Sequence, residues 1–201
     1  MSLNNITVKT IDGVGLRDAA NALNMLIFQN FVPDIIIGIR TGGYVAAEIM
    51  AKEAKHKPQL LAISRQRTST QRKNKIKCLK KILRLLPYTI TDYLRILEHK
   101  LLNFKSATEQ QSFSPNIDEL STLRGALRAR ENCKILIVDD AIDSGATMKA
   151  VLDVVRAEAN SACIIKTATI TVTTDSPIIQ PDYTLYRHVL CRLPWSFDFK
   201  S

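Results

Sequence analysis

The sequence predicts an α/β fold, a doubly wound and mainly parallel sheet. Two runs of branched apolar residues, 34–39 and 135–138, are typical of strands buried on both faces of such a sheet. Each run leads through a turn of small residues into a stretch with helical apolar spacing, which is the order of a strand–turn–helix unit. With 201 residues, the chain is long enough for one sizeable domain.

Helices are expected wherever apolar residues recur every three or four positions. These ranges are 14–30, 44–54, 76–86, 89–104, 117–130 and 148–156. Asp12 is the expected N-cap of the first helix, and Pro33 and Pro87 end the first and the third. Pro115 is the expected start of the fifth helix.

Strands are expected where short apolar or threonine-rich runs lie between these helices. The ranges are 34–39, 59–64, 135–138, 162–173 and 182–191. Because parallel strands that alternate with helices end at one common edge of the sheet, the loops at that edge are the expected ligand site.

The positive charge of the chain belongs to one stretch. The net charge is +9, but residues 54–91 hold eleven Lys or Arg and no Asp or Glu, which leaves −2 for the rest. This stretch includes the basic amphipathic helix expected over 76–86. Such a helix suits a membrane surface or an anionic partner, or it packs one apolar stripe and leaves its basic face in water.

The bulk properties predict a cytoplasmic protein. No apolar run approaches the roughly 20 residues that cross a membrane, and the N-terminus lacks the basic-then-apolar pattern of a signal peptide. The four cysteines are scattered without a CxxC pair, as expected for reduced thiols. A peripheral position at the membrane is left open by the basic stretch.

The strongest site signal lies in residues 134–147. Two carboxylates, Asp139 and Asp140, follow the apolar run directly, and a polar turn then precedes the next helix. This turn consists of Asp143, Ser144, Gly145, Ala146 and Thr147. A helix N-terminus with free N–H groups, hydroxyl donors and a close-approaching glycine binds phosphate well. Carboxylates beside it must then face sugar hydroxyls or a divalent metal, so the motif predicts a phosphorylated sugar with Mg²⁺ nearby.

A second turn with backbone donors follows the strand over 34–39. It consists of Arg40, Thr41, Gly42 and Gly43. A glycine pair after a strand is weak evidence by itself, but both turns are expected at the same edge of the sheet. Together they predict two anion-binding loops on either side of one ligand.

These two stretches closely resemble the motifs of the type I phosphoribosyltransferases. The resemblance implies that Asp139 and Asp140 hold the ribose hydroxyls of phosphoribosyl pyrophosphate (PRPP), with Mg²⁺ bound mostly through PRPP and water. It implies that residues 143–147 bind the 5-phosphate and residues 40–43 the pyrophosphate. It also implies the family's fold in a single domain, 1–201, and commonly a homodimer.

The departures from a simple member of the family are regional. Residues from about 65 to 130 are interpreted as a helical insertion at one edge of the domain. Its first part, in 64–75, corresponds to the mobile active-site loop of the family. The terminal segments, about 1–12 and 176–201, are expected to form a hood over the acceptor. Trp195 is the candidate lid residue of this hood, and the alternative is a tryptophan that only closes the core.

The resemblance further implies transfer of the phosphoribosyl group with inversion at C1. Arg40 and the glycine amides would neutralise the leaving pyrophosphate as its charge builds. Asp143 matches the position where purine-type relatives keep an acid near the acceptor, so it is assigned as general base or acceptor orienter. The alternative role for Asp143 is the N-cap of the following helix.

The acceptor is expected to be a glycan hydroxyl. The 6-oxopurine relatives read the base with a lysine near the end of the next strand, where this chain has Thr173, and Lys166 lies at the strand's other end. The basic insert, with 64–70 and 83–87, resembles phosphoribosyltransferases of bacterial polysaccharide loci. The alternatives are nucleobase salvage and a PRPP-sensing regulator acting on nucleic acid, a partner that is not expected because no helix-turn-helix or RNA-binding motif is visible.

Overall fold

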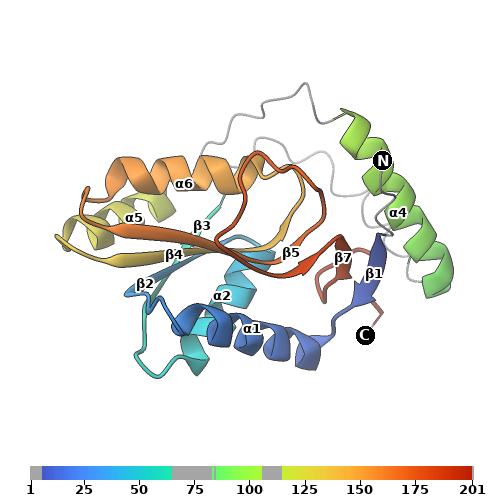
Figure 1. Cartoon of the computed structure of the whole chain (residues 1–201), viewed down its shortest axis with the longest axis horizontal. Coiled ribbons are helices and arrows are strands. Elements are labelled where there is room, and N and C mark those ends of the chain that lie inside the picture. Colours follow the sequence, from blue (N-terminus) through green and yellow to red (C-terminus); the bar gives the residue numbers. More distant parts are fainter. Residues whose placement is uncertain (1–5, 65–82, 84, 106–114, 201) are drawn as a thin grey trace.

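A five-stranded parallel sheet forms the centre of the structure, a computed structural model in which residues 6–64, 83, 85–105 and 115–200 are described (Figure 1). The strand order is β3-β2-β4-β5-β6, and every neighbouring pair is parallel. The strands are β2 (Ile35–Ile39), β3 (Gln59–Ile63), β4 (Lys134–Ile142), β5 (Ile164–Val172) and β6 (Tyr183–Arg187). The expected α/β fold with a parallel sheet is confirmed.

Two helices cover each face of this sheet (Figure 1). On one face lie α1 (Gly13–Phe28) and α2 (Gly42–Glu53), and on the other α5 (Ile117–Arg128) and α6 (Ala146–Glu158). Each pair of helices encloses a hydrophobic core with one face of the sheet. Successive strand residues point to opposite faces, so Ile36 packs in the α1/α2 core, while Ile35 and Ile37 pack in the α5/α6 core. Burial on both faces explains why these strands are apolar throughout.

A second, smaller sheet lies beside the main one. It pairs β1 (Thr7–Thr10) with β7 (Val189–Arg192) in parallel, and α4 (Tyr88–Lys105) packs against it at the far end of the molecule (Figure 1). These elements come from both terminal segments and from the expected insertion. The division of the chain into a core, an insertion and a hood stays a prediction.

The single strand expected over 182–191 is wrong. The chain breaks into β6 and β7 at His188, whose backbone has a positive φ of 59°. Its N–H still donates to the carbonyl of Val172 at the edge of the main sheet, while its own carbonyl accepts from Thr7 of the small sheet. The break arises because β7 leaves the main sheet to pair with β1, and nothing in the local sequence reports that distant pairing.

Other boundaries shift for local reasons. Asp12 caps α1 as expected, because its carboxylate accepts a hydrogen bond from the N–H of Gly15. Pro115 does not start α5; Asn116 is its N-cap, and its side-chain oxygen accepts from the N–H groups of Asp118 and Glu119. Strand β4 runs on through the acidic pair to Ile142 instead of stopping before it.

Part of the basic stretch lies outside the described residues. The helix expected over 76–86 and the mobile loop expected over 64–75 fall almost entirely in this part. The fifth helix of the sequence, α5, packs its Leu123 and Leu127 into the core beside α6. Within the described ranges, no helix combines the length and the apolar character needed to cross a membrane.

Buried charges hold the small sheet, α4 and the C-terminal segment together. Arg192 of β7 is only 1% exposed and forms ion pairs with Asp92 of α4 and Asp198 of the C-terminal segment. Its guanidinium also donates to the hydroxyl of Thr10 in β1. Arg95 of α4 binds the same Asp198 carboxylate through Nε and Nη2. The Arg192 guanidinium therefore joins the C-terminal part of the chain to β1 and α4, which are both far from it in sequence.

The Asp198 carboxylate should make the stability of this region depend on pH. Burial acts to raise its pKa, but hydrogen bonds from Arg95 and Arg192 outweigh burial and lower the pKa to about 2. A carboxylate with a lowered pKa stabilises the fold above its unfolded pKa of about 4, and this stability is lost as the pH falls toward about 2. Asp198→Asn should therefore lower the free energy of unfolding by about 3 kcal/mol at pH 7, because it removes the charge that Arg95 and Arg192 share and leaves the buried Arg192 with Asp92 as its remaining ion pair.

Urea unfolding between pH 7 and pH 3 measures this effect. The difference between wild type and Asp198→Asn should be constant down to about pH 4 and then narrow. Asp153→Asn is the control, since Asp153 forms an exposed pair with Lys149 within α6, and such pairs contribute at most about 1 kcal/mol. Equal effects of the two substitutions at pH 7 would contradict the prediction.

Candidate active site

The two predicted anion-binding loops meet at one edge of the sheet. Strands β2 and β4 are neighbours, and their register places Gly38 beside Val138. The turn that follows β2 therefore lies beside the acidic pair at the end of β4, with Gly42 and Gly43 against the two aspartates. The chain also reverses its direction of winding here, since β2 is flanked by β3 on one side and by β4 on the other. Ligands of such sheets bind at this switch point.

The glycine turn after β2 lies directly against the acidic pair. A Cβ on Gly42 would sit 2.1 Å from Oδ2 of Asp140 and 2.6 Å from Nε1 of Trp195. A Cβ on Gly43 would sit 2.6 Å from the backbone of Asp139. These distances are too short for any side chain, so glycine is required at both positions for the backbone to approach the carboxylates.

Asp139 is buried, and none of the Lys and Arg side chains that the structure describes pairs with it. Its Oδ1 accepts a hydrogen bond from the N–H of Asp140 at 2.9 Å. Burial raises the pKa of Asp139 well above its ordinary value, and the nearby charges of Asp140 and Asp143 raise it further. Asp139 therefore retains a proton at pH values where an exposed aspartate is ionised.

The turn after β4 forms a small cradle at the start of α6. Gly145 has a φ of 81° and is the N-cap, and it has no side chain that could cap the helix. The first N–H of the helix, that of Ala146, donates to the hydroxyl of Ser144 at 3.3 Å. The carbonyl of Ser144 accepts from the N–H of Ile178, which holds the turn in place. A cavity of about 130 Å³ is lined by residues 141–148 together with Asp139. The positive end of the helix suits an anion of phosphate type.

Asp143 does not cap α6, so the N-cap alternative is wrong. Its Oδ1 accepts a hydrogen bond from the hydroxyl of Thr173 at the end of β5, at 2.5 Å. The N-cap of the helix is Gly145. Asp143 is thus held by a side chain of the neighbouring strand, at the point where the small cradle opens.

A second cavity of about 260 Å³ lies on the other side of Asp143. Ala141 and Asp143 line both this cavity and the cradle, so Asp143 lies between the two. Its lining comes from the ends of β5 and β7 and from α4: Ala141, Asp143, Thr171, Thr173, Leu190, Cys191, Arg95, Glu98 and His99. The sequence did not predict the three α4 residues, because the helix was recognised by its apolar positions alone.

No lysine is among the described residues that line this cavity. Lys166 lies at the amino end of β5, where it forms an ion pair with Asp182 at 2.7 Å. Thr173 occupies the position at the carboxyl end of the strand, as the sequence indicated. Its hydroxyl is engaged with Asp143.

Arg40 is held away from the acidic pair by α5. Its Nε lies 2.8 Å from Oε1 of Glu119, and its guanidinium stacks on the ring of Tyr44 at 4.8 Å. Ser64 donates to the other oxygen of Glu119 at 2.6 Å. The sequence did not predict Glu119 as a site residue, because its contact with Arg40 depends on the fold and on no local motif.

Trp195 contacts the acidic pair from the C-terminal segment. Its indole N–H donates to Oδ2 of Asp140 at 2.8 Å, and its ring packs partly buried against the α1/α2 core. Trp195 is not one of the described residues that line the larger cavity. The indole therefore lies over the glycine turn and Asp140, and its role as an acceptor lid stays a prediction.

The family of the chain follows from comparison with known proteins. The model of the phosphoribosyl transferase domain matches residues 13–195, which spans both loops, the acidic pair and Trp195. The chain belongs to this family. It is an enzyme, a PRPP-dependent phosphoribosyltransferase, and the predicted family is confirmed. No curated protein matches the chain closely enough to count as a relative.

Solved structures of this phosphoribosyltransferase fold resemble the chain at low identity. A purine phosphoribosyltransferase from Pyrococcus horikoshii Ot3 has 18% identity and a TM-score of 0.56, with 96% of each chain covered. A xanthine-guanine-hypoxanthine phosphoribosyltransferase from Helicobacter pylori has 14% identity and a TM-score of 0.56, with 93% of this chain and 94% of that chain covered. A hypothetical protein from Neisseria gonorrhoeae with bound ppGpp has 14% identity and a TM-score of 0.58, with 94% and 90% covered. These likenesses show the fold.

Asp139→Asn should stabilise the ligand-free phosphoribosyltransferase. The raised pKa means that ionising this carboxyl costs folding free energy above its unfolded pKa of about 4, and the cost grows until the pH exceeds the pKa in the folded state. Asparagine removes the charge and keeps the shape. The melting temperature should rise by about 2–4 °C for each kcal/mol gained.

Thermal unfolding at pH 8 and pH 5 tests this expectation. The rise in melting temperature should be larger at pH 8 than at pH 5, because the free-energy cost of the raised pKa of Asp139 grows with pH in this range. Asp153→Asn on the surface of α6 should show no such gain. A lower melting temperature for Asp139→Asn at pH 8 would mean that the ionised carboxylate stabilises the fold.

Proposed function

We propose that the enzyme transfers the phosphoribosyl group of PRPP to a ring nitrogen of a nucleobase, with a purine as the preferred class. The observation that carries this proposal is a pair of neighbouring cavities that are both lined by Asp143. The smaller one suits a phosphate, and the larger one, at about 260 Å³, suits a small flat acceptor better than a chain of sugars. Two of the similar structures named above are purine phosphoribosyltransferases.

In this proposal PRPP lies across the edge of the sheet. Its 5-phosphate occupies the cradle of residues 143–147, its ribose hydroxyls face Asp139 and Asp140, and its pyrophosphate meets residues 40–43. The contact of Gly42 with Asp140 supports this arrangement, because it brings the pyrophosphate loop and the ribose-binding acids to one ligand.

Mg²⁺ fits the proposed site as a partner of PRPP. Asp139 and Asp140 offer carboxylate oxygens, the donors that Mg²⁺ prefers. Among the described residues, however, there is no group of three or more His, Cys, Asp or Glu that could hold a metal. The protein would therefore bind Mg²⁺ mostly through PRPP and water, and the ion would neutralise charge on the pyrophosphate.

The protein residues then act on the two ends of the reaction. The C1–O bond to pyrophosphate breaks while a C1–N bond to the base forms, and the proton of the ring nitrogen passes to the Asp143 carboxylate. Arg40 leaves Glu119 to approach the pyrophosphate, since its side chain is about half exposed and needs only a rotation of its own bonds. The glycine amides supply further donors to the leaving group.

Recognition of the acceptor would differ from that of the 6-oxopurine enzymes that use lysine. Here Thr173 positions Asp143, and the wall opposite carries Arg95, Glu98 and His99 of α4. A polar wall of this kind can pair with the donors and acceptors at the edge of a base.

The glycan acceptor expected from the sequence has no support in the comparisons. The basic segment that carries the resemblance to polysaccharide enzymes lies mostly outside the described residues. A glycan is therefore kept as an outcome of the acceptor experiment below.

Pyrophosphate release with a panel of acceptors tests the proposal. The enzyme is incubated with PRPP and Mg²⁺ and with adenine, guanine, hypoxanthine, xanthine, uracil or a lipid-linked glycan. At least one purine should raise the rate well above the rate without acceptor, and the double substitution of Asp139 and Asp140 by Asn should abolish it. Stimulation by the glycan alone, with none of the bases active, would overturn the nucleobase assignment.

Gly42→Ala tests the pyrophosphate loop. The added Cβ would collide with Asp140 and with the indole of Trp195, so the loop or the acids must move. A displacement of about 1 Å at reacting groups can lower the rate about 100-fold, which is the expected loss in kcat/KM for PRPP.

Gly125→Ala is the matched control for this substitution. Gly125 lies within α5, and a Cβ there would have no neighbour within 4 Å. This variant should keep full activity and gain about 0.5–1 kcal/mol of stability, because alanine is the better helix former. Equal activity of Gly42→Ala and Gly125→Ala would contradict the assigned role of the loop.

A further inference from the structure

The amphipathic helix α4 is turned with its apolar face toward solvent. Five apolar side chains at helical spacing lie on this outer face, each between 40% and 68% exposed: Ile90, Tyr93, Leu94, Leu97 and Leu101. The opposite side of the helix is polar and faces the protein, with Thr91 and His99 buried there. A surface helix normally has the reverse arrangement, with its apolar face toward the core.

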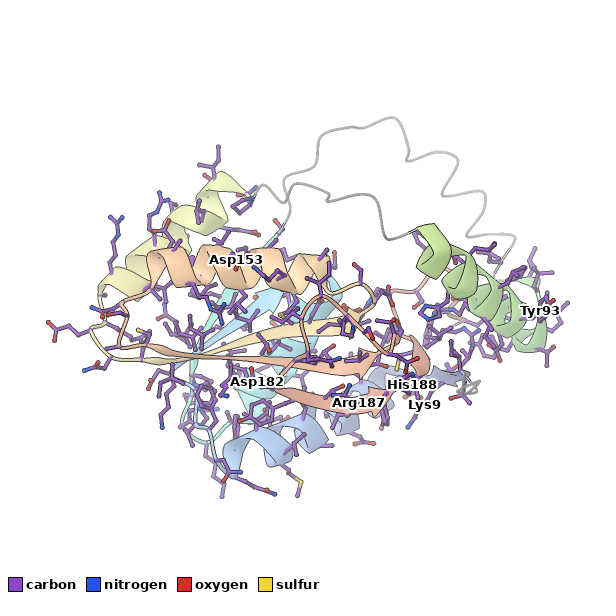
Figure 2. All side chains as sticks on the ribbon, turned by 45° about the horizontal axis from the view of Figure 1, so that its top comes forward. Lys9, Tyr93, Asp153, Asp182, Arg187 and His188 are labelled. Carbon is purple, nitrogen blue, oxygen red and sulfur yellow. The ribbon has the colours of Figure 1, made fainter. Side chains whose placement is uncertain are left out.

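The polar side of α4 is fixed by the protein interior. Arg95 binds Asp198, and Asp92 pairs with the buried Arg192. A rotation of the helix that buried the apolar face would break both ion pairs. The outward orientation is therefore set by these contacts, and Figure 2 shows Tyr93 projecting from α4 away from the sheets.

The five exposed side chains recur at helical spacing and form one continuous apolar stripe. Contiguous exposed apolar patches of more than a few hundred Å² mark contacts with other proteins or with membranes. A stable dimer buries about 800 Å² on each partner, which is more than one stripe of five side chains supplies.

Charge favours a membrane over a second copy of the chain. Residues 65–84, which lead into α4, contain nine Lys or Arg and no Asp or Glu. Two copies joined through α4 would bring two such segments close together, and like charges repel. Anionic lipid headgroups would be attracted instead, because clustered Lys and Arg beside an amphipathic helix bind such surfaces.

We propose that the outer face of α4 docks the enzyme on an anionic lipid bilayer. The helix would lie in the plane of the interface, with its apolar side chains among the lipid chains. The inner side of the same helix carries Arg95, Glu98 and His99, which line the larger cavity. The bilayer would thus contact the side of α4 opposite to the side that lines the larger cavity. The proposal goes beyond the proposed function and does not depend on the acceptor.

Sedimentation of the full-length protein with vesicles tests the docking. Vesicles of phosphatidylcholine alone are compared with vesicles that contain about 30 mol% phosphatidylglycerol as the anionic lipid. The wild type should bind the anionic vesicles at least about tenfold more than the neutral ones, and high salt should weaken this binding. Absence of binding to the anionic vesicles at low salt would overturn the proposal.

The double variant Leu94→Glu/Leu97→Glu tests the face itself. It should lower binding to anionic vesicles at least about tenfold, because charged groups are excluded from the lipid. Val14→Glu/Met25→Glu is the matched control, since these two exposed apolar residues of α1 are 70% and 72% exposed and lie away from α4. Equal loss in both variants, or no loss in the first, would overturn the assignment to α4.

Two further measurements separate the alternatives. Light scattering after gel filtration reports the mass in solution; a dimer that Leu94→Glu/Leu97→Glu dissociates would identify the face as a contact between copies and would overturn the proposal. Tyr93→Trp adds an indole on the face, and its emission should shift to the blue on addition of anionic vesicles. Thermal unfolding checks that each variant is folded, and PRPP-dependent activity is not needed for any of these readouts.

Discussion

The close packing of a glycine turn against two carboxylates is the constraint on which the site depends. Strands β2 and β4 lie side by side, so the turn after one strand must pass the acids at the end of the other. Only the missing side chains of Gly42 and Gly43 allow that passage. The arrangement brings backbone donors and acidic groups within reach of one ligand, which is the requirement for binding a sugar that carries phosphate at both ends.

The burial of the Asp139 carboxyl group is unfavourable for the stability of the fold. Asp139 is buried among other carboxylates, and the raised pKa follows from burial and from their charge. Such a site is poorly satisfied without a ligand, and it gains favourable interactions when hydroxyl groups or a cation reach it. The surrounding apolar strands, which are buried on both faces, are rigid enough to hold the carboxylates in this position.

The sheet and both loops could be predicted from the sequence because their signals are local. A branched apolar run, an acidic pair and a small-residue turn are adjacent in the chain, and parallel pairing alone brings the turns to one edge. The orientation of α4 could not be predicted, since an apolar stripe indicates that a face is covered but does not say by what. Glu119 and the break at His188 were missed because their contacts join segments that are far apart in sequence. The roles of Arg40, Asp143 and Trp195 stay predictions.

The short C-terminal segment joins the acid pair to the small sheet. Trp195 holds Asp140, and three positions later Asp198 neutralises Arg192 and Arg95. Deleting residues 195–201 would therefore remove both contacts and keep every strand of the main sheet. The carboxylate of Asp140 and the ion pairs of the small sheet thus depend on one short segment that adds no strand to either sheet.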